Sequence, residues 1–308
     1  MEETGGVSHC GFPLNPVIKL SEPMTHDAAL NTGNRLIVVK AQELFAKGGR
    51  GFSKWFYRIK EAGGVHQYFN YGGKILLSHV MHNRVLRNCT TEMYAEAIDV
   101  LQPNLSTTID GETYLDKQIL AKKECARCLD ETAKLMNLCP NHRFVGLVKG
   151  ASVGQVELYL EGLLTLGMTD FALHAGDFLC RGNRLARESA IQYARVIRPK
   201  ARTFTLYGAS SPLYVWRFPP ADAYITQTHF IMAFNGQKLI NGHWQHVNYK
   251  ADSALITHNF NEMRKAAENV ANPKGGLMTW EAGIMEAAAL LQEAATASVE
   301  AKKTATSL

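Results

Sequence analysis

Short apolar, β-branched runs alternate with segments of helical periodicity along most of this chain, and this alternation is the strongest constraint on its fold. Three long stretches repeat apolar residues every three or four positions, as crossover helices do: Leu115–Leu138, Gly154–Leu166 and Arg184–Ile197. Several of the apolar runs are continuous, which is typical of strands buried on both faces of a parallel sheet. Seven runs are predicted to be strands: Arg35–Val39, Lys74–Ser78, Ser106–Asp110, Phe144–Gly150, Asp170–Gly176, Thr203–Ser210 and Ala223–Thr228.

The order of these units favours an α/β fold, a (β/α)8 TIM-type barrel, over an open doubly wound sheet. The chain has 308 residues, 46% of them hydrophobic, which is enough for a single barrel domain spanning residues 1–308. Residues 278–308 are rich in Ala, Glu and Lys, so they predict a C-terminal helical extension with a frayed tail.

Composition excludes several classes of protein. No run reaches the roughly 20 consecutive apolar residues that a membrane span needs, and the polar N-terminus lacks the apolar centre of a signal peptide. Six cysteines in a chain of this length do not indicate a disulfide scaffold. We therefore expect a cytoplasmic protein with no membrane partner. Its net charge of +5 permits an anionic partner without requiring one.

In a TIM barrel the reactive groups lie at the carboxyl ends of the strands and in the loops that follow them. Asp110 and Glu112 would place two carboxylates close together for acid–base chemistry, although Asp110 could instead be the N-cap of the next helix. His174 and Asp177 flank a glycine that allows close ligand approach, although a strand-end histidine is also commonly structural. The substrate-binding candidates of this kind are Glu112, Lys149, Gly150, His174, Gly176 and Asp177.

Cysteine spacing raises the question of a metal site. Cys125, Cys128, Cys139 and His142 have spacing that zinc ligands can have. The three cysteines also fall on one helical stripe with Leu135, and buried cysteine is common in helices. The core interpretation is the stronger one, so we expect no metal.

Two segments, 47–60 and 236–250, alternate cations with aromatic residues. Cations neutralise phosphates and aromatic rings stack on bases, so these segments predict a nucleic-acid surface. An amphipathic helix with its aromatic residues in the core explains this composition equally well. The glycine clusters match no Walker or dinucleotide-binding motif, and no cofactor is expected. The residues expected to bind nucleic acid are Arg50, Lys54, Trp55, Arg58 and Lys238.

Five motifs between Tyr68 and Gln237 occur in the order in which a known family carries them. An early tetrapeptide consists of Asn70, Tyr71, Gly72 and Gly73; the later motifs are Asp110, the pentapeptide Gly146–Gly150, the pair Ala175 and Gly176, and Leu206 with Gly208 and Pro212. Together they resemble the tRNA-guanine transglycosylase superfamily, including the branch that inserts 7-deazaguanine derivatives into DNA. The resemblance implies that Asn70, Tyr71, Gly72 and Gly73 bind substrate.

The chain also departs from that family's pattern. Asn70 replaces the Asp of the family's Asp-Ser-Gly-Gly motif, and Lys149 replaces the Gln of its Gly-x-Val-Gln-Gly motif. The family's C-terminal cysteine-rich zinc motif is missing, since no cysteine follows Cys180. Aligning on the Asn-Gly-Gln stretch puts Ile225 at the position of the family's nucleophilic Asp, and a shifted alignment puts Asp222 there.

The resemblance implies an enzyme that exchanges a guanine-type base for a 7-deazaguanine derivative in nucleic acid, with DNA favoured over tRNA. It implies that Asp110 recognises the base and that Asp222 is the catalytic nucleophile, because exchange at a glycosidic carbon needs a carboxylate to trap or stabilise an oxocarbenium-like centre. The implied partners are DNA or RNA and the base; a homo- or heterodimer stays open.

Two alternatives remain. A non-catalytic paralogue would keep the barrel and the nucleic-acid surface, as the substitution at Asn70 allows. An unrelated barrel enzyme acting on a small metabolite would use Lys149 and His174 as a base or Schiff-base pair.

Overall fold

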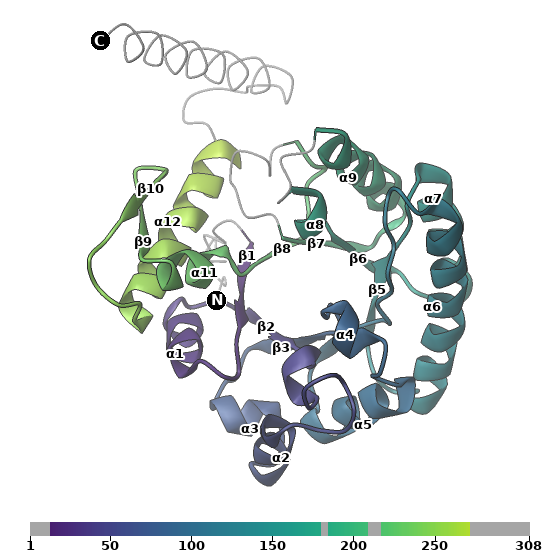
Figure 1. The fold of residues 1–308 in the computed structure, drawn as a ribbon, viewed down its shortest axis with the longest axis horizontal. Coiled ribbons are helices and arrows are strands. Elements are labelled where there is room, and N and C mark those ends of the chain that lie inside the picture. The colour runs from purple at the N-terminus through teal and green to yellow at the C-terminus, as the bar shows by residue number, and fades with distance from the viewer. Residues whose placement is uncertain (1–12, 180–183, 209–216, 272–308) are drawn as a thin grey trace, which may run out of the picture. The chain divides into compact units, whose positions relative to one another are not determined.

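The computed structural model of the chain describes residues 13–179, 184–208 and 217–271. Eight parallel strands close into a barrel in sequence order, with helices around it (Figure 1). Pairing of the first strand with both the second and the eighth closes the ring. The chain is therefore a TIM barrel, as predicted. The strands are β1 (Leu14–Ile18), β2 (Leu36–Lys40), β3 (Lys74–Ser78), β4 (Leu105–Thr107), β5 (Phe144–Val148), β6 (Asp170–His174), β7 (Thr203–Tyr207) and β8 (Ala223–Thr226).

Helices follow the strands and cover the outside of the barrel. They are α1 (Pro23–Asn31), η1 (Ala41–Leu44), α2 (Lys54–Glu61), α3 (Val65–Phe69), α4 (Asn83–Leu86), α5 (Thr91–Leu101), α6 (Gln118–Leu138), α7 (Val153–Thr165), α8 (Gly176–Leu179), α9 (Arg184–Ile197) and η2 (Arg198–Lys200). After β8 come α11 (Thr228–Phe234), the hairpin of β9 (Gln237–Ile240) and β10 (His243–His246), and α12 (Ser253–Ala271). No helix in these described ranges is long and apolar enough to cross a membrane.

The chain divides into two compact units, Met1–Ala267 and Glu268–Leu308, and the barrel belongs to the first. The helix predicted for residues 278–308 lies outside the described residues.

Alternate residues of each strand face the barrel interior, because successive side chains of a strand point to opposite faces. One buried cluster contains one such set, including Val17, Val38, Leu76, Leu147, Ala172, Tyr207 and Ile225. The intervening strand residues, such as Ile37 and Phe171, belong to the other cluster, which includes helix residues such as Phe56 and Tyr159. Two residues beyond Val38, Leu147, Ala172 and Ile225 are Lys40, Lys149, His174 and Gln227, which line a cavity at the carboxyl ends of the strands, so the first set faces the interior and the second faces the helices.

All seven predicted strands are present, and sequence reasoning missed β1. Its sequence, LNPVI, is buried at every position. Asn15 and Pro16 disguise it, because proline lacks the N–H that a central strand normally donates and asparagine is rare in strands. Most predicted strands also run two or three residues beyond the carboxyl end of the observed strand, into the loop or helix that follows, and Ala209 and Ser210 lie outside the described residues.

Candidate functional site

A cavity of about 710 Å³ opens at the carboxyl ends of the strands. The strand alternation explains which side chains enter it. Continuing two residues beyond the inward-facing Val38, Leu147 and Ile225 reaches Lys40, Lys149 and Gln227. The polar residues that line the cavity at the strand ends are Lys40, Asp110, Lys149, His174 and Gln227. The barrel thus brings together residues that lie far apart in the sequence at the opening formed by the carboxyl ends of its strands, which we call the mouth.

Asp110 and Lys149 form a buried ion pair at the ends of β4 and β5. The Lys149 Nζ contacts Asp110 Oδ1, and the two side chains are only 11% and 7% exposed. The same carboxylate oxygen accepts a hydrogen bond of 2.9 Å from the backbone N–H of Gly111. Burial would raise the pKa of Asp110, but the charge and hydrogen bond of Lys149 outweigh it, so the pKa is lowered. Asp110 is therefore an ionised acceptor held beside an amine donor.

His79 immediately follows β3 and holds the backbone of Asp110 in place by a hydrogen bond. Its Nδ1 accepts a hydrogen bond of 3.0 Å from the backbone N–H of Asp110, and the backbone N–H of His79 donates to Thr107 Oγ1 at 2.8 Å. The ring packs edge-on against Tyr94, with 4.4 Å between the ring centroids. His79 is fully buried, and burial lowers its pKa to about 4.

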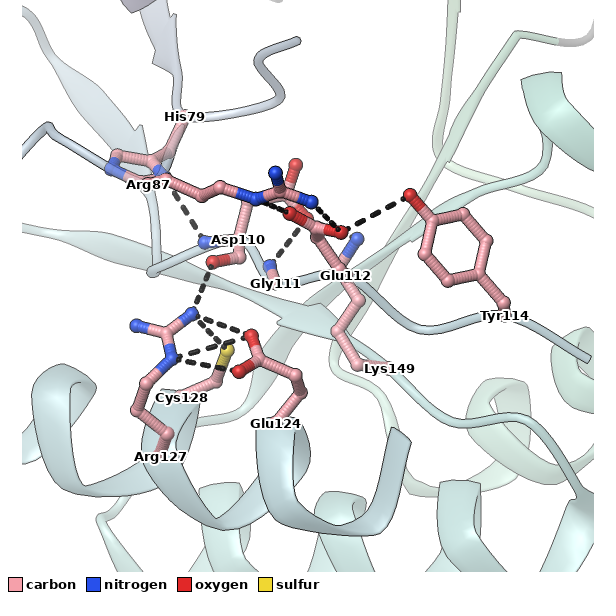
Figure 2. A network of polar contacts seen from close by, with 10 residues as sticks. All are labelled: His79, Arg87, Asp110, Gly111, Glu112, Tyr114, Glu124, Arg127, Cys128 and Lys149. Atoms are coloured by element: carbon pink, nitrogen blue, oxygen red, sulfur yellow. Dashed lines mark hydrogen bonds and ion pairs between the residues drawn. The ribbon is translucent and has the colours of Figure 1, made fainter. Parts of the chain in front are cut away.

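A second polar network continues along the loop after β4 (Figure 2). Arg87 binds Glu112 through two hydrogen bonds of 2.6 and 3.0 Å, and the Tyr114 hydroxyl donates to the same carboxylate. Asn83 of α4 donates to the Tyr114 hydroxyl. These contacts connect the loops after β3 and β4, so Glu112 is neutralised by Arg87 and lines the cavity wall.

The α6 helix holds this loop from outside. Arg127 hydrogen-bonds Glu124 at 2.9 Å and reaches the carbonyl oxygen of Asp110 at 3.4 Å. A Cβ on Gly111 would lie 2.5 Å from Cys128 Sγ, so a larger residue there would have to displace the Cys128 side chain. The helix begins at Gln118, so the alternative in which Asp110 is its N-cap is wrong.

On another side of the mouth, Lys40 Nζ donates a 2.6 Å hydrogen bond to Gln227 Oε1. Lys40 is the last residue of β2 and Gln227 follows β8, and these two strands are the neighbours of β1. The contact therefore closes the mouth over the end of β1.

The other predicted site residues at the carboxyl end differ in whether they line the cavity. His174 is half-buried and lines the cavity, with its ring centroid 6.3 Å from that of Tyr207. Gly150 also lines it, and a Cβ there would lie 2.8 Å from the backbone nitrogen of Val156, so α7 approaches it closely. Gly176 begins α8 beside Gly208, and Asp177 belongs to the same helix, but its side chain is outside the described parts.

The early tetrapeptide lies at the opposite end of the barrel. Asn70 is the left-handed C-cap of α3, and Tyr71, Gly72 and Gly73 lead into the amino end of β3. The Tyr71 hydroxyl donates to the carbonyl oxygen of Asn34, which precedes β2. The prediction that these four residues bind substrate at the mouth is wrong, because residues that precede a parallel strand lie at its amino end.

Asp222 is also at the amino end. Its carboxylate accepts a 2.7 Å hydrogen bond from the Phe204 N–H and lies 3.7 Å from Arg198. It ties β8 to β7 and cannot be a nucleophile at the mouth. Ile225, the alternative position, is 1% exposed in the barrel interior. The neutral Gln227, immediately after β8, lines the cavity instead.

The cysteines do not assemble a zinc site. Cys125 and Cys128 are buried on the inner stripe of α6, and this burial raises their pKa values to about 11 and 12. His142 Nε2 instead pairs with Ser106 Oγ at 2.9 Å. Within the described residues, no cluster of three or more His, Cys, Asp or Glu could hold a metal ion.

The predicted nucleic-acid residues fall on two elements and one loop. Arg50 is exposed in the loop after β2, and Lys54, Trp55 and Arg58 belong to α2, while Lys238 is on β9. The cations of Lys54 and Arg58 lie 5.1 and 4.9 Å from the Trp55 ring, so they already cover it. Phe56 and Ile59 are buried, as the amphipathic-helix alternative requires.

Comparison with known proteins adds little to this geometry. No known protein family and no curated protein matches the chain in sequence. Among solved structures, the spore coat polysaccharide biosynthesis protein SpsE of Bacillus subtilis is similar over 87% of this chain and 72% of its own, at 11% identity and a TM-score of 0.43. The putative copper homeostasis protein CutC of Streptococcus agalactiae is similar over 70% of this chain and all of its own, at 15% identity and a TM-score of 0.43. KGPDC of Streptococcus mutans is similar over 82% of this chain and 96% of its own, at 12% identity and a TM-score of 0.43. Identities this low concern the barrel fold and say nothing of its ligand.

Proposed function

We propose that the mouth of this barrel recognises a guanine-type base, through the Asp110–Lys149 pair. The single observation that carries the proposal is the juxtaposition of an ionised carboxylate and an amine donor in one buried wall of the cavity. The edge of guanine presents a carbonyl acceptor beside two donors, the ring N–H and the exocyclic amine. A carboxylate can accept from both donors while the ammonium donates to the carbonyl.

The remainder of the cavity is compatible with a planar ligand. Tyr114 and Phe178 line it and provide aromatic surface, and its size is within the range of about 300–1,000 Å³ that encloses organic ligands. His174 adds a titratable group beside the pair. The resemblance to transglycosylases supports the same ligand class through Asp110.

Base exchange itself has less support than base recognition. A transglycosylase needs a carboxylate against the glycosidic carbon, and β8 presents the amide of Gln227 to the cavity instead. Among the described residues, the lining carboxylates Asp110, Glu112 and Asp116 come from the loop after β4, and Lys149 and Arg87 neutralise the first two. We therefore favour the non-catalytic, base-binding form of the proposal.

Nucleic acid is the proposed source of the base. Arg50 is in a loop at the same end of the barrel as the mouth, and a Cβ on Gly49 of that loop would lie 2.5 Å from the Val85 carbonyl oxygen, so the loop packs closely on α4.

Single-stranded DNA or RNA should bind with affinity that falls steeply with salt, and Arg50→Glu should reduce the slope of log affinity against log salt by about one. Lys74→Glu, at the amino end of β3, is the control that should leave it unchanged. Binding that does not depend on salt would contradict this part.

Calorimetry with guanine and 7-deazaguanine tests recognition. Asp110→Asn and Lys149→Met should each weaken binding about tenfold or more, because each removes a charge-assisted hydrogen bond. Adenine, whose edge reverses these donors and acceptors, should bind weakly to all forms. Equal affinity for adenine and guanine would overturn the proposal.

A second candidate function has one specific observation in its favour. Lys149 is a buried amine beside a carboxylate and close to His174, which is an arrangement suited to Schiff-base chemistry on a carbonyl substrate. Borohydride reduction with small aldehydes and ketones should then attach substrate covalently to Lys149, as seen by mass spectrometry. Absence of adducts at Lys149 across such a panel would remove this candidate.

A further inference from the structure

The charges that line the mouth are unevenly distributed between its walls. In a closed ring of eight strands, β8 lies across from β4. In the described parts of the chain, the carboxylates that line the cavity are Asp110, Glu112 and Asp116, which all belong to the loop after β4. The strands β2 and β8 flank β1, which lies across from β5, and among the described residues this part of the lining contributes Lys40, Gln42 and Gln227 and no carboxylate. The cavity therefore has one wall with ion-paired carboxylates and one donor-rich wall without carboxylates among the described residues.

The geometry of the donor-rich wall suits an anion. Gln227 Oε1 accepts from Lys40 Nζ, which turns the amide nitrogen, a donor, away from the ammonium. Glu43 interacts electrostatically with Lys40, and its carboxylate also accepts a 2.9 Å hydrogen bond from the Ser21 N–H. Glu43 does not line the cavity, so its carboxylate does not face a ligand bound there.

We infer that the ligand carries a phosphate, bound by Lys40 and Gln227, so that the mouth takes a purine nucleoside monophosphate unit and not a bare base. The inference rests on the proposed base recognition and extends it to the other end of the ligand. A base against Asp110 and Lys149 leaves its sugar phosphate to extend toward the opposite wall. A cavity of about 710 Å³ is larger than a bicyclic base alone requires.

Affinities for guanine, guanosine and GMP test this directly. Wild-type protein should bind GMP about tenfold more tightly than guanosine, because a charge-assisted contact is added. Lys40→Met should remove that advantage and leave the affinity for guanine within about twofold. Lys74→Met, the same substitution on an exposed lysine at the amino end of β3, should change neither.

Competition by inorganic phosphate tests the phosphate site on the wild-type protein, without a variant. It should compete with GMP for the wild-type protein but leave guanine binding intact. Equal affinities for GMP and guanosine, or a Lys40→Met protein that weakens guanine as much as GMP, would overturn the inference. Guanine bound through Asp110 without a GMP advantage would leave the proposed function standing, whereas GMP bound through Lys40 without any binding of guanine would overturn the proposed function alone.

The phosphate has two sources, a free nucleotide or a nucleic-acid strand. A single-stranded oligonucleotide with one guanine separates them. If it binds more tightly than GMP, with the same loss on Lys40→Met, the phosphate belongs to a strand. If GMP binds and the oligonucleotide does not, the ligand is a free nucleotide.

Discussion

The backbone N–H of Asp110 donates a 3.0 Å hydrogen bond to Nδ1 of His79. Because Nδ1 accepts, the neutral ring carries its proton on Nε2. Burial lowers the pKa of His79 to about 4, so this tautomer persists at neutral pH. His79 does not line the cavity that holds Lys149; it acts through the backbone of Asp110 and is a positioning residue.

Replacing His79 should therefore affect both stability and binding. His79→Leu leaves the Asp110 N–H buried without an acceptor, which should cost about 1–3 kcal/mol in the free energy of unfolding and weaken guanine binding. His79→Asn offers a carbonyl oxygen near the position of Nδ1 and should recover part of both. Urea unfolding and calorimetry measure the two effects. Equal losses in the two variants would show that the hydrogen bond does not matter.

The Asp110–Lys149 pair predicts a non-additive double mutant. Asp110→Asn leaves the Lys149 ammonium buried and uncompensated, and Lys149→Met does the same to Asp110, so each should destabilise the fold by about 3–5 kcal/mol. The double variant removes both charges and should regain a large part of that loss. Urea unfolding of the four proteins tests this cycle, and strictly additive losses would contradict the buried pairing.

Sequence patterns were sufficient for the barrel because its strands are apolar runs bounded by polar residues. They also singled out Asp110, Lys149 and His174, since each follows or ends a recognisable strand. The pairing of Asp110 with Lys149 depends on β4 and β5 being neighbours, which only the closed ring establishes.

The errors have physical causes that the sequence already contained. The four residues 70–73 were assigned to the site by motif, although they precede their strand and so belong to the amino end. Lys40 was missed because the predicted strand ended at Val39, one residue before it, and the stretch Thr226–His229 was flagged at the end of β8 without Gln227 being singled out from it. His79 had no separate signal, because its role comes from a backbone contact with a residue 31 positions away.

Asp222 should prove structural when it is replaced. Asp222→Asn weakens the acceptor for the Phe204 N–H and removes the charge near Arg198, so we expect a loss of about 1 kcal/mol in the free energy of unfolding. Guanine affinity should not change, because Asp222 lies at the amino end of the barrel. A stable Asp222→Asn protein that no longer binds the base would show that Asp222 belongs to the binding site.

Asp170, at the amino end of β6, predicts how stability depends on pH. It accepts hydrogen bonds from Arg143 at 2.9 Å, Arg202 at 2.5 Å and Thr203 at 2.8 Å. Burial would raise the pKa of Asp170, but these partners outweigh it and lower the pKa to about 2 from 3.8. A lowered folded-state pKa means that the stabilisation is fully present above the unfolded pKa and is lost as pH falls through the folded one.

The window for that loss is therefore from about pH 4 to about pH 2, and the shift corresponds to about 2 kcal/mol. Asp170→Asn should be less stable than wild type by about this amount at neutral pH, and the two proteins should converge as the pH falls through the window. Urea midpoints measured across that range test the convergence, with guanine affinity at neutral pH as the control. A stability difference that persists below about pH 2 would mean that the neutral hydrogen bonds, not the charge, stabilise this end of the barrel.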